Sequence, residues 1–87
     1  MADNEYHVAS YVVSTRPEEG GNVAERINRV PGLEVHVEQQ GKLVVTAEAR
    51  NVRELAEFAT SLEDVGGVIS VAPVYHEYEN APGAINQ

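Results

Sequence analysis

The chain has no cysteine among its 87 residues. This absence excludes a disulfide framework, a thiolate metal site and a cysteine nucleophile, and it fits a protein of a reducing compartment. No apolar run approaches the roughly 20 residues that span a bilayer. Residues 1–5 are acidic and polar, without the basic segment and apolar run of a secretory signal. We therefore expect a cytoplasmic protein with no membrane span.

Basic residues are also scarce, because six lysines and arginines stand against 14 aspartates and glutamates, for a formal charge of −8. Phosphate backbones are polyanions, so this balance argues against nucleic acid as a ligand. A sheet that binds RNA would display several aromatic residues for base stacking, whereas Tyr11 is the single candidate on the expected central strands. The acidic surface either favours a basic partner or serves solubility alone.

What the chain does contain is a plan used twice: an apolar strand, an amphipathic helix and a second apolar strand. The first copy comprises a strand at 6–14, a helix ending near residue 30 and a strand at 33–37; the second comprises a strand at 43–49, a helix at 51–65 and a strand at 68–76. Both helices must bury their apolar stripes on one sheet, through right-handed crossovers. The sequence predicts an α+β fold, a ferredoxin-like βαββαβ sandwich with a four-stranded antiparallel sheet of order 4-1-3-2 and two helices on one face.

Local signals predict where the elements and the domain begin and end. Thr15 and Glu18 have the spacing of a capping box before the first helix, and Asn51 is a good N-cap for the second. A three-residue loop at 39–41 is expected to close the hairpin between the second and third strands. Residues 1–5 are expected to be a flexible leader, 6–77 one domain and 78–87 a disordered tail. The expected buried stripes are Val23, Ile27 and Val30 in the first helix and Val52, Leu55, Phe58, Ala59 and Leu62 in the second.

The alternation of polar and apolar residues predicts which strand positions face the helices. The inward set is Ala9, Tyr11, Val13, Leu33, Val35, Val37, Leu43, Val45, Ala47, Ile69, Val71, Pro73 and Tyr75. The outward set is Val8, Ser10, Val12, Glu34, His36, Glu38, Lys42, Val44, Thr46, Glu48, Ser70, Ala72, Val74 and His76. The uncovered face therefore carries valine, alanine, serine and threonine where a solvated sheet usually carries charges.

This uncovered face is the predicted site for an apolar, basic peptide. Small side chains let a helical peptide approach closely, and each apolar anchor that becomes buried contributes roughly 1.5–3 kcal/mol. The residues assigned to peptide binding are Val8, Ser10, Val12, Val44, Thr46, Ser70, Ala72, Val74 and His76, with Glu34, Glu38 and Glu48 at the rim. Two alternatives stay open: a weak homodimer in which two sheets pack face to face, and a small-molecule-sensing regulatory domain of ferredoxin-like fold.

No residue set for catalysis or for a cofactor stands out. His36 and His76 lie on opposite edge strands, roughly 14 Å apart, and cannot share a metal. His7 and His76 lie at neighbouring strand ends, but two ligands without a third make a poor metal site, so solvent-exposed strand-end histidines are the better interpretation. Acylphosphatases share the architecture, yet in the loop after the first strand Pro17 removes a backbone donor and two glutamates oppose an anion. We expect no enzyme activity, no cofactor and no metal.

Four segments carry a resemblance to a known family: VASYVV (8–13), VPGLEV (30–35), GKLVV (41–45) and, most specifically, GVISVAPVYH (67–76). Over about residues 6–79 the chain resembles the NapD family, the assembly chaperones of the periplasmic nitrate reductase. The resemblance implies a cytoplasmic chaperone without a cofactor. It implies further that the protein binds the twin-arginine signal peptide of the molybdenum-containing catalytic subunit and delays export until cofactor insertion is complete.

Overall fold

The computed structural model describes the backbone from residue 5 to residue 80 and the side chains from residue 6 to residue 74. The elements are β1 (Glu5–Thr15), the 3-10 helix η2 (Pro17–Glu19), α1 (Gly20–Asn28), β2 (Leu33–Gln39), β3 (Lys42–Ala49), α2 (Val52–Asp64) and β4 (Val68–Asn80). Most of the expected leader and residues 81–87 of the expected tail lie outside the described residues. Residues 78–80, which the sequence assigned to the tail, pair with β1 instead.

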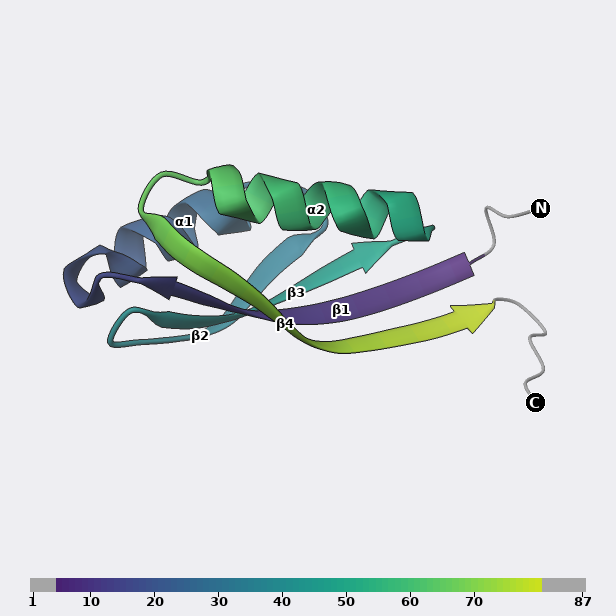
Figure 1. The fold of residues 1–87 in the computed structure, drawn as a ribbon, viewed down its shortest axis with the longest axis horizontal. Helices are drawn as coiled ribbons and strands as arrows, with labels where there is room; N and C mark the ends of the chain where they lie inside the picture. Colours follow the sequence, from purple (N-terminus) through teal and green to yellow (C-terminus); the bar gives the residue numbers. More distant parts are fainter. Residues whose placement is uncertain (1–4, 81–87) are drawn as a thin grey trace.

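The four strands form one antiparallel sheet with the order β2-β3-β1-β4. This is the predicted order 4-1-3-2, and the predicted ferredoxin-like sandwich is confirmed. Both helices lie on the same face of the sheet, so the opposite face is left uncovered by any described element (Figure 1). We call this opposite face the open face.

The core lies between the two helices and the covered face of the sheet. The predicted inward positions of β1 and β3 are confirmed, since their side chains are almost entirely buried. Burial raises the pKa of the Tyr11 phenol, which therefore stays neutral and packs as a core ring. Val52 is 61% exposed because it is the first residue of α2, so its assignment to the core was wrong. The buried apolar residues are Ala9, Tyr11, Val13, Val23, Ile27, Leu33, Leu43, Val45, Ala47, Ala49, Leu55 and Leu62.

The two helices begin differently from each other. The Asn51 side chain accepts a hydrogen bond from the Glu54 backbone N–H at 2.9 Å, which confirms the predicted N-cap of α2. The predicted capping box of the first helix is wrong, because Thr15 ends β1 and its hydroxyl lies 2.8 Å from the Arg16 carbonyl oxygen. A 3-10 turn with Pro17 in its first turn leads into α1 instead.

A β-bulge in β2 changes the faces of the residues that follow it. Val35 pairs with Val45, but Val37 pairs with Val44, so His36 is the extra residue. Because one residue is absorbed in the bulge, the hairpin closes through two residues, Gln40 and Gly41, and not through the predicted three. Both have positive φ, 54° and 83°, as a type I′ turn requires.

Two predicted orientations in β2 were wrong because of this bulge. Val37 lies on the open face opposite Val44 and is 49% exposed, although it was assigned to the core. Glu38 pairs with the buried Leu43, and its carboxylate lies against Gly20 on the helix side of the sheet. A carboxylate is favoured there because the N-terminus of α1 carries the positive end of the helix dipole.

Substitution of Val37 by glutamate tests the observed register. In the structure the new carboxylate would lie in solvent, so the free energy of unfolding should change by no more than about 1 kcal/mol. If Val37 lay in the core, the same change would bury an unpaired charge and the protein would not fold. Urea unfolding followed by far-ultraviolet circular dichroism separates the two outcomes.

The edge strand β4 contains two similar irregularities in its pairing with β1. Ser14 pairs with Ser70 while Thr15 pairs with Val68, so Ile69 is an extra residue and is 67% exposed instead of buried as predicted. A second shift lies at Val74. Beyond it Ser10 pairs with Tyr75 and Ala9 with His76, which reverses the predicted register of these two positions. The side chains of residues 75–80 lie outside the described part of the chain.

Candidate functional site

The open face carries a row of four apolar residues that crosses the whole sheet. Val37 of β2 lies opposite Val44 of β3, Val44 opposite Val12 of β1, and Val12 opposite Ala72 of β4. We call these four residues the apolar row. Its strands are spaced about 4.8 Å apart, so the row spans roughly 14 Å. It is a continuous apolar strip on the side of the sheet that no described helix covers.

The apolar row is accessible in the free protein. Val37 and Val44 are 49% and 36% exposed, Ala72 is exposed and Val12 is half-buried. The adjacent β1 residues Val8 and Ser10 are half-buried on the same face. Covering such a strip with a partner is favourable, because each Å² of apolar area removed from water lowers the free energy by about 25 cal/mol.

One end of the open face is acidic. Glu34 of β2 pairs with Thr46 of β3, and Glu48 lies two residues further along β3. These three residues, with Gly32 and Leu33, line a hollow of about 210 Å³. The Thr46 hydroxyl lies 2.7 Å from the His36 Nε2, so the bulge places the imidazole beside the same hollow. We call Glu34 and Glu48 the acidic end.

The other end of the open face is polar and carries a positive charge. Lys42 begins β3, and its ammonium donates a hydrogen bond of 2.9 Å to the Ser14 hydroxyl of β1. Ser14 pairs in turn with Ser70 of β4. From Lys42 to Glu48 is six residues along β3, or about 20 Å, with the apolar row between them.

The structure brings most of the predicted site residues together on one face of the sheet. Glu38 lies on the helix side, so its predicted place on the open face was wrong. The backbone of His76 pairs with the core residue Ala9, which differs from the predicted register. Val37 lies on the open face although the sequence predicts it in the core, because the strict alternation of β2 gives no sign of a bulge. The predicted residues that share the open face are Val8, Ser10, Val12, Val44, Thr46, Ser70 and Ala72, with Glu34 and Glu48; Val74 is exposed at its bulge.

The two histidines whose side chains the structure describes, His7 and His36, lie in different surroundings. His7 is buried at 2% exposure on the core side of β1, so the prediction that it contacts solvent was wrong. His36 is exposed on the open face. Among the described residues no three histidine, cysteine, aspartate or glutamate side chains are placed to hold a metal ion.

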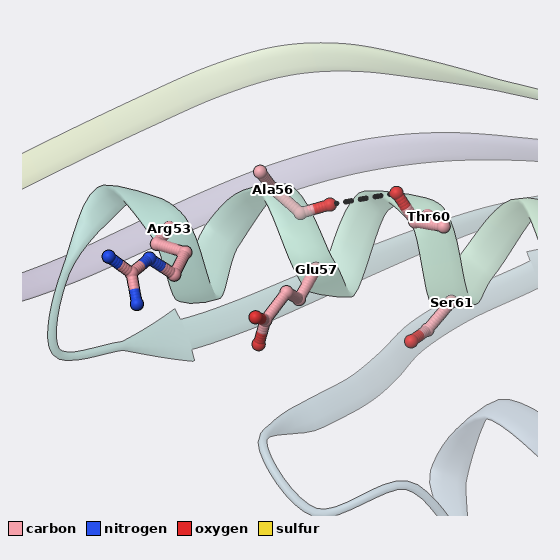
Figure 2. A pocket seen from close by; sticks show the side chains of 5 residues that line it. All are labelled: Arg53, Ala56, Glu57, Thr60 and Ser61. Carbon is pink, nitrogen blue, oxygen red and sulfur yellow. Dashed lines mark hydrogen bonds between the residues drawn. The ribbon is translucent and has the colours of Figure 1, made fainter.

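A larger hollow, of about 390 Å³, lies on the outer side of α2, away from the open face. Figure 2 shows its five side chains spread along the helix without converging on one point. The Thr60 hydroxyl donates a hydrogen bond of 3.1 Å to the Ala56 carbonyl oxygen of the same helix. Arg53, Glu57 and Ser61 complete the lining, and this is the surface of a solvent-facing helix.

The described residues form a small α+β domain whose sheet is covered by helices on one face (Figure 1) and carries an apolar row and an acidic end on the other. No helix in the described part of the chain is long and apolar enough to cross a membrane. The profile of the family described as "NapD protein" matches residues 6–80, so the chain belongs to the NapD family.

Individual relatives agree with the family assignment. The Chaperone NapD of Escherichia coli K12 is 34% identical over 76 residues, which cover 85% of this chain and 87% of that protein. The Chaperone NapD of Paracoccus pantotrophus is 30% identical over 71 residues, covering 82% and 63%. The solution structure of the E. coli Tat proofreading chaperone protein NapD covers 100% of this chain and 93% of that chain, with a TM-score of 0.78 and 31% identity. These relatives are named chaperones, and the chain is a chaperone of this family and not an enzyme.

Proposed function

We propose that this protein is a cytoplasmic chaperone that binds the twin-arginine signal peptide of the catalytic subunit of the periplasmic nitrate reductase. Binding would take place on the open face and would delay export until the molybdenum cofactor has been inserted. The observation that carries the proposal is the apolar row beside the acidic end, in a member of the NapD family. A relative of the same fold is described as a Tat proofreading chaperone.

The apolar stretch of such a peptide supplies most of the affinity. Each leucine or phenylalanine side chain that it buries on the row contributes roughly 1.5–3 kcal/mol. The row consists of three valines and one alanine, whose short side chains let a peptide helix approach the sheet closely. The chaperone itself needs no cofactor for this function.

The acidic end complements the adjacent arginines of the peptide. Glu34 and Glu48 are both exposed and flank one hollow, where a carboxylate can accept two parallel hydrogen bonds from a guanidinium group. Because both carboxylates remain in contact with water, they steer the encounter and set its orientation more than they hold the complex together.

The function is tested by titrating the purified protein with a synthetic twin-arginine signal peptide, followed by fluorescence anisotropy. We expect saturable one-to-one binding. A pull-down from the native cytoplasm should recover the nitrate reductase precursor. If neither experiment detects the peptide, and the protein instead self-associates or binds a small metabolite by calorimetry, the proposal is wrong.

Removing the rim charges should slow association. The double variant Glu34→Gln with Glu48→Gln should bind the peptide several-fold more weakly, chiefly through a lower association rate, because steering is lost. Glu38→Gln is the control, because it removes a carboxylate that lies on the helix side of the sheet and not at the acidic end. It should have little effect on peptide binding. Stopped-flow binding at low and high salt measures this, since salt screens exposed charges.

A peptide in which both arginines are replaced by lysine keeps its charge but loses the planar fork. It should bind the wild-type protein moderately more weakly than the arginine peptide. On the double variant, which lacks both carboxylates, the lysine peptide and the arginine peptide should bind with the same affinity. Equal rates for both peptides under all salt conditions would mean that the acidic end serves only solubility.

A further inference from the structure

The charges of the open face are arranged along the strands and not around a ring. The acidic end, at the start of β2 and the end of β3, holds Glu34 and Glu48. The opposite end holds Lys42, which is the one lysine or arginine in the described strands. Its ammonium is held over β1 by the hydrogen bond to Ser14. A ligand that lies along the strands therefore meets opposite charges at the two ends of the face.

We infer that the signal peptide binds in one direction, with its arginines at the acidic end and its apolar stretch passing over the apolar row toward Lys42. The inference rests on the proposed function, because it takes the ligand to be a peptide with adjacent arginines followed by an apolar stretch. In the reverse direction the arginines would meet the Lys42 ammonium, and Glu34 and Glu48 would face the apolar stretch. Both of these contacts are unfavourable. The arginines and Lys42 repel each other as like charges, and the two carboxylates lose water without gaining a partner.

The dimensions of the face fit this direction. About 20 Å separates Lys42 from Glu48 along β3, which equals the length of roughly 13 residues of α-helix. The apolar row crosses the sheet about two residues, or roughly 7 Å, from the Lys42 end. The first apolar residues after the arginines thus lie over Thr46 and Ser10, and the later ones over the valines. Lys42 then meets the C-terminal end of the bound segment, where a helix carries the negative end of its dipole.

Single spin labels test the direction, and the absence of cysteine from the chain makes each labelled position unique. A nitroxide on Gln39→Cys lies beside Lys42, because these two residues pair across the hairpin. A nitroxide on Arg50→Cys lies two residues beyond Glu48. On a ¹⁵N-labelled peptide, the label at 50 should broaden the resonances around the arginines, and the label at 39 those beyond the apolar stretch. Ser61→Cys, on the outer side of α2, is the control and should broaden neither (Figure 2).

The outcomes separate this inference from the proposed function. A reversed broadening pattern, or both labels broadening both ends equally, would overturn the single direction while leaving peptide binding intact. The charge-exchanged variant, Lys42→Glu with Glu48→Lys, should shift the pattern toward the reverse direction. An unchanged pattern in this variant would show that the charges do not set the direction. If no labelled protein changes the anisotropy or the spectrum of the peptide, the proposed function itself fails.

Discussion

Replacing Val44 by glutamate should abolish most of the peptide affinity while leaving the fold intact. Val44 lies in the middle of the apolar row and is 36% exposed, so the carboxylate is solvated in the free protein and the stability should change by no more than about 1 kcal/mol. In the complex the same carboxylate would lose its water beneath an apolar peptide without gaining a partner. We expect a loss of at least about 3 kcal/mol, or more than a hundredfold in Kd.

The kinetics should show which step is affected. An additional negative charge attracts a basic peptide at long range, so the association rate should not fall. The loss should therefore appear as faster dissociation, which stopped-flow or surface plasmon resonance measures directly.

Val52→Glu is the matched control for this prediction. It introduces the same charge at a more exposed valine, 61% accessible, at the start of α2 on the other side of the sheet. It should leave peptide binding unchanged. If both variants lose binding equally, the effect comes from net charge, and the apolar row is not the contact surface.

The topology was predictable from the sequence because it depends on features that tolerate small errors. Two strand–helix–strand units admit few arrangements, and the positions of the helices follow from stripes such as Val23 and Ile27, both fully buried in α1. Asn51 was predictable as an N-cap because the interaction is local, within three residues. The open face of β1 and β3 was predictable because both strands keep a strict period of two.

The errors in the open-face assignment came from two bulges, at His36 and Val74, whereas the bulge at Ile69 changed only the exposure of Ile69 itself. A bulge changes the parity of every later residue, so one unpredicted insertion moved Glu38 to the helix side and Val37 to the open face. His36 and Ile69 carry no local signal, such as a glycine, that distinguishes a bulge from regular strand, whereas Pro73 before Val74 is a residue that strands place at edges and bulges. Whether a strand bulges depends on how it pairs with its neighbouring strand. That pairing joins residues far apart in the sequence, so a short stretch of sequence does not reveal it.

Gly41 is one residue at which such a long-range contact can be seen, because it joins the β2–β3 hairpin to the end of β1. Its φ is +83°, and its carbonyl oxygen accepts a hydrogen bond from the Thr15 backbone N–H at 2.7 Å. A Cβ at this position would lie 2.5 Å from the Thr15 carbonyl oxygen and 3.0 Å from the Pro17 nitrogen. The two-residue β2–β3 hairpin therefore packs directly on the backbone where β1 ends, and only glycine leaves enough room.

Gly41→Ala should accordingly lower the free energy of unfolding by about 3 kcal/mol. Roughly 1–2 kcal/mol of this comes from a side chain in the left-handed region, and the rest from displacing backbone atoms that cannot rotate away. Gly21→Ala is the control, because a Cβ there meets nothing within 4 Å inside α1, and it should stabilise the protein by about 0.5–1 kcal/mol. Urea unfolding of both variants measures the difference. If Gly41→Ala is as stable as the wild type, the hairpin does not pack against the end of β1. The hairpin register that pairs Val37 with Val44 would then be in doubt as well.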